Sequence, residues 1–422
     1  MKGQLQELLN KELLRQQNSL ELIASENYVS RWVLSAYSNV FTNKYSEWYP
    51  GKRYYGGNEV VDELELYTQD LALQIFWLDK NKWWVNVQAL SGSVANLAVY
   101  TGVLEAGDTV LAMDLASGGH LTHGMKLNTS AKFFNFIHYG VDEKGIIDYN
   151  NLKELALEHK PKLILAGFSS YPRSLEWYKF VECKKLLEEQ GHHCYLMADI
   201  AHIAGLIAGK VLLSPFEAGF DIITTTTHKT LRGPRGALIY FNTQNNATIE
   251  KDINRGVFPG VQGGPFDHVL VAKSRAFEEI LDPEVKRNQY CSQIISNTKV
   301  FADELQNLGW ELATGGTENH LLVLDVTKNN GKATEHTGKT AEKALEEIWL
   351  STNKQLIPHD PRSPMDPSGL RIGTPAITSR GLIEEDMKEL AMIINKCLTS
   401  QENHNLLSSQ VLQLCKKYPL WY

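Results

Sequence analysis

Short apolar runs alternate with amphipathic stretches through the middle of the chain. The runs end in polar or glycine-rich segments and read WVNVQAL (84–90), DTVLAMD (108–114), KLILAGFS (162–169), CYLMADI (194–200) and DIITTTT (221–227). Between them, YNNLKELALEHK and KFVECKKLLEEQG repeat their apolar residues with a helical period. This alternation of strands and helices predicts an α/β domain with a largely parallel sheet.

Both ends of the chain have a different pattern. Residues 1 to about 24 are predicted to be helical, with four leucines on one face: Leu5, Leu8, Leu9 and Leu13. Near the other end, helical stretches around 284–308 and 383–398 flank the strand-like HLLVLDV. We therefore expect an N-terminal helical arm (1–45), a large α/β domain (46–280) and a smaller C-terminal α+β domain (281–422).

Composition and charge exclude several classes of protein. The 422 residues are 43% apolar, and 42 basic against 49 acidic side chains leave a net charge of −7. The chain therefore has no excess of basic residues of the kind expected in a nucleic-acid-binding protein. The apolar runs are too short to cross a bilayer, and the N-terminus has no apolar signal core. Five scattered cysteines form no disulfide framework. We expect a cytoplasmic protein without a membrane or nucleic-acid partner.

Chemically distinctive residues follow four of the apolar runs, where an open α/β sheet binds its ligands. Lys229 follows DIITTTT, Asp199 ends CYLMAD, Ser91-Gly92-Ser93 follows WVNVQAL, and His120 lies in a glycine-rich loop after DTVLAMD. Each has an ordinary alternative, such as a surface lysine or a helix-capping Asp or Ser. Together they offer an amine, a carboxylate, a phosphate cradle and a planar ring, which fits pyridoxal phosphate.

Other ligands fit this pattern less well. No Walker or G-x-G-x-x-G sequence is present, so a nucleotide is not expected. As a metal-binding pair, His120 and His123 are expected to lack a carboxylate or cysteine neighbour, so we expect no zinc site.

Longer motifs then give a close family resemblance over nearly the whole chain. They read LIASEN (22–27), TNKYSEWYPGKRYYGG (42–57), VNVQALSGSVAN (85–96), GGHLTHG (118–124), MADIAHIAGLIAG (197–209), TTTTHKTLRGPRG (224–236), FPGVQGGP (258–265), GGTENHLL (315–322) and DPRSP…SGLRIGTPAIT (360–378). In these motifs the chain resembles the serine hydroxymethyltransferases. The resemblance implies a fold-type I pyridoxal-phosphate transferase with a mainly parallel, seven-stranded sheet in its large domain. It also implies the exchange of a hydroxymethyl group between serine, glycine and tetrahydrofolate.

The resemblance assigns the cofactor contacts residue by residue. Lys229 would hold pyridoxal phosphate as a Schiff base, with His228 beside it, Asp199 on the pyridinium nitrogen and His120 stacked on the ring. His202 and Ser169 would contact the ring's substituents. The phosphate would be bound by Ser91, Gly92 and Ser93, and across a subunit interface by Gly263 and Gly264. Tyr45 would be a further cofactor contact from the same interface.

The resemblance also assigns the contacts to substrates. Arg371 and Ser25 would bind the amino-acid carboxylate, Glu47 would act as the acid–base group, and Tyr55 would lie beside it. The folate contacts would be Leu115, Gly119, Leu121, Gln355, Ser363, Pro364 and Met365. We expect a homodimer whose subunits share their active sites.

Several positions depart from the family pattern. Trp48 stands where the family has glycine, Gln355 replaces asparagine, and Met365 replaces phenylalanine. We expect the Trp48 ring to face solvent or an interface. The folate-side changes leave open a folate-independent aldolase for β-hydroxy amino acids, of the threonine aldolase kind. A non-catalytic scaffold is a further alternative, although such a protein would not need Lys229, Asp199, His120 and Arg371 together.

Overall fold

The computed structural model describes residues 2–244, 246–400 and 403–422. Its largest sheet has seven strands in the order β2-β8-β7-β6-β5-β3-β4. Only β8 runs against its neighbours; the other pairings in this sheet are parallel. The strands are β2 (Trp83–Asn86), β3 (Thr109–Met113), β4 (Asn135–Tyr139), β5 (Leu163–Gly167), β6 (Tyr195–Asp199), β7 (Ile222–Thr226) and β8 (Ala237–Asn242).

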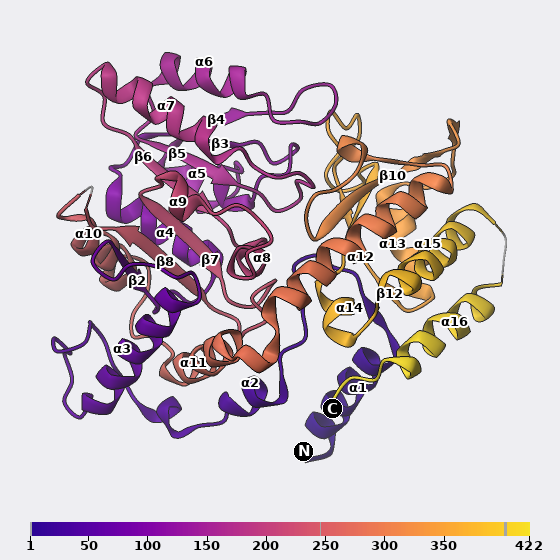
Figure 1. Ribbon diagram of the computed structural model, residues 1–422, viewed down its shortest axis with the longest axis horizontal. Coiled ribbons are helices and arrows are strands. Elements are labelled where there is room, and N and C mark those ends of the chain that lie inside the picture. Colours follow the sequence, from indigo (N-terminus) through magenta and orange to yellow (C-terminus); the bar gives the residue numbers. More distant parts are fainter. Residues whose placement is uncertain (1, 245, 401–402) are drawn as a thin grey trace.

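Helices cover both faces of this sheet, as Figure 1 shows. A large apolar core on one face receives side chains from α3 (Glu59–Gln74), α6 (Tyr149–His159), α7 (Trp177–Glu189), α8 (Ala204–Ala208), α9 (Pro215–Ala218) and α11 (Asp267–Leu281). A second apolar core on the other face is formed with α4 (Gly92–Val103) and α10 (Ile249–Arg255). The short helix α5 (Thr129–Phe133) directly precedes β4 in the sequence. Strands covered on both faces must be apolar throughout, which explains the continuous runs in the sequence.

A smaller antiparallel sheet forms the second part of the molecule. Its order is β11-β10-β14-β13, with β9 also paired to β10. Its strands are β9 (Trp310–Leu312), β10 (Leu321–Asn329), β11 (Lys332–Ala333), β13 (Asn353–Gln355) and β14 (Gly369–Gly373). The helices of this part are α12 (Arg287–Asn307), α13 (Gly338–Glu347), α14 (Pro375–Arg380), α15 (Glu384–Thr399) and α16 (His404–Lys417).

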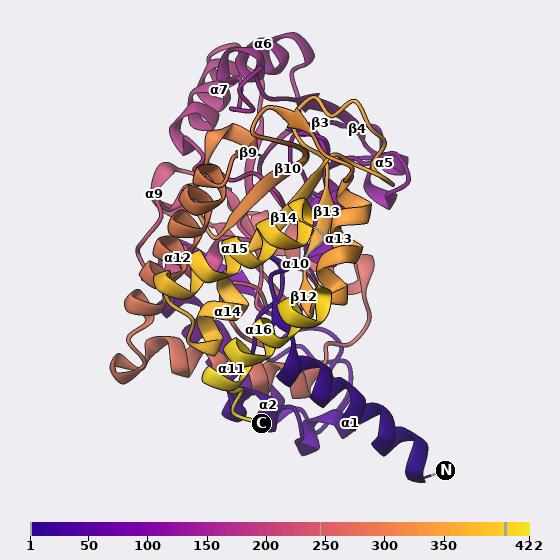
Figure 2. The same cartoon turned by 90° about the vertical axis from the view of Figure 1, so that its right-hand side faces the viewer.

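The N-terminal segment joins the two parts. After α1 (Lys2–Asn18), strand β1 (Leu20–Glu21) pairs in parallel with β12 (Leu350–Ser351), and α2 (Arg31–Ala36) then packs on α11 of the large part. Helix α1 projects from the body of the molecule in Figure 2. Its predicted leucine face lies in solvent, since Leu5, Leu8 and Leu9 are 65%, 56% and 57% exposed.

The predicted α/β fold with a seven-stranded, mainly parallel sheet and a C-terminal α+β part is confirmed. The alternation of strands and helices did not predict that β8 is antiparallel, because the apolar residues of a strand do not indicate its direction in the sheet. The division at residues 45 and 280 stays a prediction. Within the described residues, no helix is long and apolar enough to cross a membrane.

Leu22→Ala should destabilise the segment that carries Ser25. Leu22 is fully buried, and its carbonyl accepts a hydrogen bond from Gly373 N at 2.7 Å. Truncating a buried leucine leaves a cavity and costs about 2–5 kcal/mol of unfolding free energy. Denaturant unfolding should show this loss, whereas the matched variant Leu127→Ala, at a side chain 80% exposed, should change stability by less than about 0.5 kcal/mol. Equal effects of the two variants would contradict the packing described.

Candidate active site

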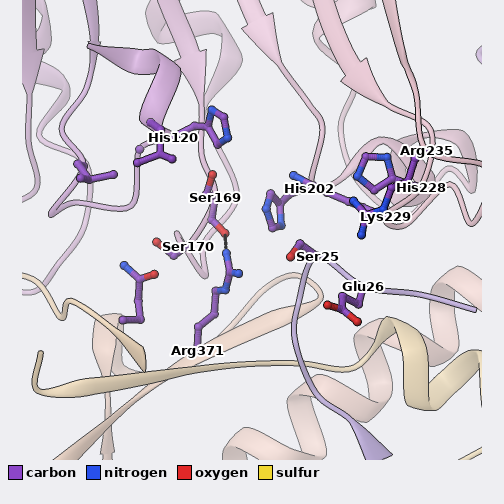
Figure 3. Close-up of a pocket in the computed structure, with 14 residues that line it drawn as sticks. Ser25, Glu26, His120, Ser169, Ser170, His202, His228, Lys229, Arg235 and Arg371 are labelled. Atoms are coloured by element: carbon purple, nitrogen blue, oxygen red, sulfur yellow. Dashed lines mark hydrogen bonds between the residues drawn. The ribbon is translucent and has the colours of Figure 1, made fainter. Parts of the chain in front are cut away.

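Two adjoining cavities meet at Lys229, beyond the carboxyl ends of the parallel strands. Their volumes are about 330 Å³ and about 200 Å³. The smaller one reaches the Ser91–Ser93 loop and Asp199, and the larger one, drawn in Figure 3, reaches Ser25 and Arg371. Residues lining both cavities are His120, Ser169, His202, His228, Lys229 and Arg235. The site is thus continuous, with Lys229 between two compartments.

The Ser91–Ser93 loop forms the start of α4. The Ser91 hydroxyl caps the helix by accepting a hydrogen bond from Val94 N at 3.4 Å. A side chain at Gly92 would not fit, because its Cβ would lie 2.8 Å from Cγ2 of Thr226 on β7. The remaining N–H groups of the first turn suit a phosphate. These features fit the predicted phosphate cradle.

Asp199, at the end of β6, is a buried and supported carboxylate. Its Oδ2 accepts a hydrogen bond from Asn96 Nδ2 at 2.8 Å, and its Oδ1 accepts one from Ala201 N at 3.0 Å. Burial opposes the charge, but His123, His120 and Asn96 outweigh it and hold the pKa of Asp199 well below its ordinary value. An ionised carboxylate here fits a pyridinium partner.

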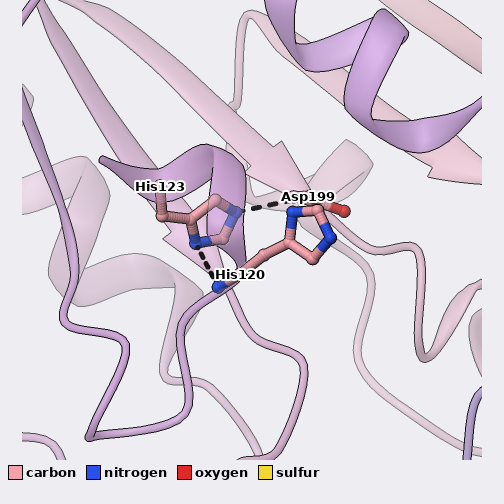
Figure 4. Close-up of side chains that lie close together, drawn as sticks. All are labelled: His120, His123 and Asp199. Atoms are coloured by element: carbon pink, nitrogen blue, oxygen red, sulfur yellow. Dashed lines mark hydrogen bonds and ion pairs between the residues drawn. The ribbon is translucent and has the colours of Figure 1, made fainter. Parts of the chain in front are cut away.

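His120, His123 and Asp199 lie close together, as Figure 4 shows. The expectation that these histidines lack a carboxylate neighbour is wrong, because β6 brings Asp199 beside them. The His120 N–H donates to His123 Nδ1 at 3.2 Å, so His123 Nε2 carries the proton and points at Asp199 Oδ2, 3.4 Å away. Nδ1 of His123 thus fixes the ring against the His120 backbone N–H, and Nε2 supports the Asp199 charge.

The Lys229 amine is prepared for nucleophilic attack. Burial lowers the pKa of Lys229 to about 8. The Asp199 charge partly offsets this decrease, and the Arg371 and Arg235 charges add to it. At neutral pH roughly a tenth of such amines are uncharged, against well under a hundredth for an ordinary lysine. An uncharged amine can form a Schiff base with a carbonyl cofactor.

The histidines around Lys229 are uncharged at neutral pH. Burial lowers the pKa of His120 to about 4 and that of His228 to about 3, and it takes the pKa of His202 well below the ordinary value. His202 Nδ1 shares a hydrogen bond of 3.1 Å with His320 Nε2. His228 Nδ1 is buried without a partner among the described residues. Neutral rings can lie against a planar cofactor and exchange hydrogen bonds with it.

Arg371 brings a cationic fork from β14 into the larger cavity. Its Nη1 donates to the Ser169 carbonyl oxygen at 2.8 Å, and its Nε donates to Asn353 Oδ1 at 3.0 Å. The guanidinium keeps donors in reserve, because these two bonds use only part of its five N–H groups. Burial lowers the pKa of Arg371 to about 10, so the cation persists at neutral pH. A carboxylate ligand would supply the missing acceptor.

Five predicted site residues lie together elsewhere on the surface: Tyr45, Glu47, Tyr55, Gly263 and Gly264. A Cβ on Gly264 would lie 3.5 Å from Glu47 Cγ and 3.6 Å from the Tyr45 ring. The Tyr45 and Tyr55 rings meet edge to face at 5.3 Å, and the Glu47 charge raises the pKa of Tyr45. Among the described residues, none of these five lines either cavity at Lys229.

Trp48 follows Glu47 in a conformation that suits glycine. Its φ of +80° is left-handed, which costs a residue with a side chain about 1–2 kcal/mol. The ring is 43% exposed and packs edge to face on Phe258 at 5.5 Å. The expected outward-facing ring is therefore present, and the ring lies away from the cavities at Lys229.

The predicted folate residues divide into two sets. Leu115, Gly119, Leu121 and Gln355 line the larger cavity. The Ser363–Met365 segment does not line it, and Met365 is 77% exposed.

Several further residues of the site were not predicted from the sequence, among them Arg235, Asn96 and His320. Arg235 lines both cavities, Asn96 supports Asp199, and His320 pairs with His202. Arg235 could have been found, since its RGPRG turn begins three residues after Lys229. Asn96 and His320 carry no such signal, because they reach the site from a helix interior and from the second part of the chain.

Comparison with known proteins gives one consistent family. The serine hydroxymethyltransferase family model matches residues 1–394. Serine hydroxymethyltransferase 2 of Pseudomonas putida is 46% identical over 422 residues, covering 99% of this chain and 97% of the relative. Serine hydroxymethyltransferase 2 of Pseudomonas fluorescens is 46% identical over 416 residues, covering 98% and 95%. With the fold and the Lys229 site in agreement, the chain belongs to the serine hydroxymethyltransferase family.

Proposed function

We propose that this chain converts L-serine and tetrahydrofolate reversibly into glycine and 5,10-methylenetetrahydrofolate, with pyridoxal phosphate bound to Lys229. The observation that carries the proposal is the continuous site that unites the Lys229 amine, the Asp199 carboxylate and the Arg371 fork. A serine or glycine molecule presents the amine and the carboxylate that Lys229 chemistry and Arg371 require. Family membership supports the same reaction.

The protein would hold the cofactor through the smaller compartment. Ser91, Gly92 and Ser93 would bind the phosphate, His120 would cover the ring, and Asp199 would keep the ring nitrogen protonated. When bound, pyridoxal phosphate supplies an electron sink for bonds at the substrate's α-carbon. His202 and Ser169 would fix the ring's other polar substituents.

The larger compartment would orient the amino acid. Arg371 and Ser25 would hold the carboxylate, which sets the direction of the bonds at the α-carbon. Glu47, supplied by a second subunit, would hold the proton exchanged with the substrate hydroxyl. Leu115, Gly119, Leu121 and Gln355 would receive the folate, with Ser363, Pro364 and Met365 at the outer end.

We further propose a homodimer with shared sites. Glu47, Tyr45, Tyr55, Gly263 and Gly264 lie together but do not line the cavities at the chain's own Lys229, which supports their presentation by a second copy. The leucine face of α1 also lies in solvent, and a symmetric partner would cover such apolar surface. A cytoplasmic location is proposed as well, supported by five free, buried cysteines.

The reaction is tested with serine in the presence and absence of tetrahydrofolate. We expect folate-dependent formation of glycine, measured by chromatography. Arg371→Lys should raise KM for serine roughly 10–100-fold, because a point charge replaces a bidentate fork. Arg275→Lys, in an exposed ion pair, is the matched control. Serine cleavage that proceeds equally without folate would instead favour the aldolase.

The amine of Lys229 should set the pH dependence of cofactor loading. With a pKa of about 8, the uncharged fraction rises about tenfold per pH unit below 8 and levels off above it. Stripped protein mixed with pyridoxal phosphate should therefore load faster as pH rises, with a midpoint near 8, followed by Schiff-base absorbance. A rate still climbing steeply at pH 10 would indicate an ordinary lysine. Lys229→Ala should show no such absorbance.

Mixed dimers test whether the sites are shared. Lys229→Ala and Glu47→Gln should each be nearly inactive alone. After subunit exchange at equal amounts, half of the dimers are mixed and each holds one intact site, so about a quarter of wild-type activity should return. Absence of recovery, with exchange verified by differently tagged subunits, would place Glu47 and Lys229 of one chain in the same site.

A further inference from the structure

The loop that carries Glu47 is held by one buried arginine. Arg53 Nη1 donates to the carbonyl oxygens of Ser46 and Trp48, at 2.8 Å and 2.7 Å. These are the residues on either side of Glu47, so a single guanidinium nitrogen fixes the backbone from which the Glu47 side chain projects.

Arg53 is fixed in turn by two carboxylates of α3. Its Nε lies 2.8 Å from Asp62 Oδ1, and its Nη2 lies 2.6 Å from Glu65 Oε2. The side chains of Arg53 and Glu65 are only 4% and 0% exposed. Asp62 also accepts a hydrogen bond from Gly51 N at 2.7 Å. The planar fork thus has a defined orientation, since Asp62 and Glu65 are neighbours on one turn of helix.

Gln88 holds the same loop from the sheet. Its Nε2 donates to the Trp48 carbonyl oxygen at 2.9 Å and to Glu65 Oε1 at 2.9 Å. The backbone carbonyl oxygen of Gln88 accepts a hydrogen bond of 2.9 Å from Nε2 of Gln262, the residue directly before Gly263. Gln88 therefore connects the Glu47 loop with the Gly263–Gly264 segment.

Helix α11 fixes both ends of this arrangement. The Ser46 hydroxyl donates to the Asp267 carboxylate at 2.7 Å. The buried Lys273 amine donates to the carbonyl oxygens of Val87 and Ala89, at 2.6 Å and 3.4 Å, on either side of Gln88. The backbone is thereby held on both sides of Gln88.

We propose that Arg53, Glu65 and Gln88 are positioning residues that set the place of the Glu47 carboxylate, and with it Gly263 and Gly264, in the active site of a partner subunit. The inference rests on the proposed function. Arg53, Glu65 and Gln88 would make a surface loop rigid enough for catalysis across a subunit interface.

Apolar packing alone does not fix this loop. Tyr45, Trp48 and Tyr55 are 57%, 43% and 45% exposed, so their rings contribute little burial within the subunit. A buried ion pair is a costly way to stabilise a fold, and well-packed apolar residues often do as well or better. An arginine bonded to the two carbonyls that flank Glu47 offers what apolar residues cannot, which is a fixed backbone direction at Glu47.

The kinetic consequence is specific. Displacing Glu47 should slow the step in which it exchanges a proton, while Arg371 still binds the substrate carboxylate. Loss of the network should therefore lower kcat and leave KM for serine within about twofold. A residue with a merely structural role would instead change stability and the amount of active protein.

Gln88→Leu is the sharpest test, because it keeps Arg53 and both its carboxylates. In the dimeric holoenzyme we expect kcat to fall about tenfold, because the loop loses the hydrogen bond from Gln88 to the Trp48 carbonyl oxygen that helps to place Glu47. Hydrogen–deuterium exchange of residues 44–57 should become at least about tenfold faster. Gln88→Asn shortens the reach by one methylene and should be intermediate. Arg53→Met should give a larger effect in both measurements, and Arg275→Met, at an exposed arginine of α11, should change neither.

The outcomes separate the two proposals. Faster exchange of residues 44–57 together with lower kcat and unchanged KM supports the positioning role. Unchanged exchange in Gln88→Leu overturns it whatever the activity, and so does faster exchange with unchanged kcat. A wild-type protein without folate-dependent serine turnover overturns the proposed function, and the positioning role in that reaction fails with it, while exchange still reports whether the network holds the loop.

Discussion

The site depends on a negative charge kept ionised inside the protein. Asp199 is buried at the end of β6, and burial alone would favour its neutral form. Asn96 from α4, the backbone after β6 and the His123 ring replace the water that the carboxylate has lost. These groups come from separate segments, so the charge can persist only if the sheet, α4 and the loop after β3 are assembled together. The support of the Asp199 charge is thus complete only in the folded large part.

Parallel strands explain why so much of this site could be predicted from sequence. Strands that run in one direction deliver their following loops to one edge, so Lys229, Asp199, His120 and the Ser91–Ser93 loop had to meet. Residues that reach the site by other routes could not be placed in this way. Asn96 arrives from inside a helix, and His320 and Arg371 come from the second part of the chain. Motif resemblance identified Arg371, but not the Ser169 carbonyl and Asn353 that orient it.

Sequence patterns also gave little indication of the geometry of the surface loop. YSEWYPGKRYYGG is dense in turn-forming and aromatic residues, which predicts a loop but no shape. Its shape follows from Arg53 lying between Asp62 and Glu65, and from Gln88 across the sheet edge. Such long-range polar contacts have no periodicity to detect. The leucines of α1 show a second limit of prediction from sequence. Their spacing predicted a helix, but it could not tell whether the apolar face packs against the rest of the chain or lies in solvent.

The separation of Glu47 from Lys229 within one chain has a consequence for how activity scales. If neither half of the site works without a second copy, an isolated subunit contributes no turnover, however well folded and loaded it is. Specific activity then becomes a readout of association: on dilution below the dissociation constant of the dimer, total rate falls with the square of protein concentration. The cell's output from this enzyme would respond more steeply than linearly to its expression level in that range.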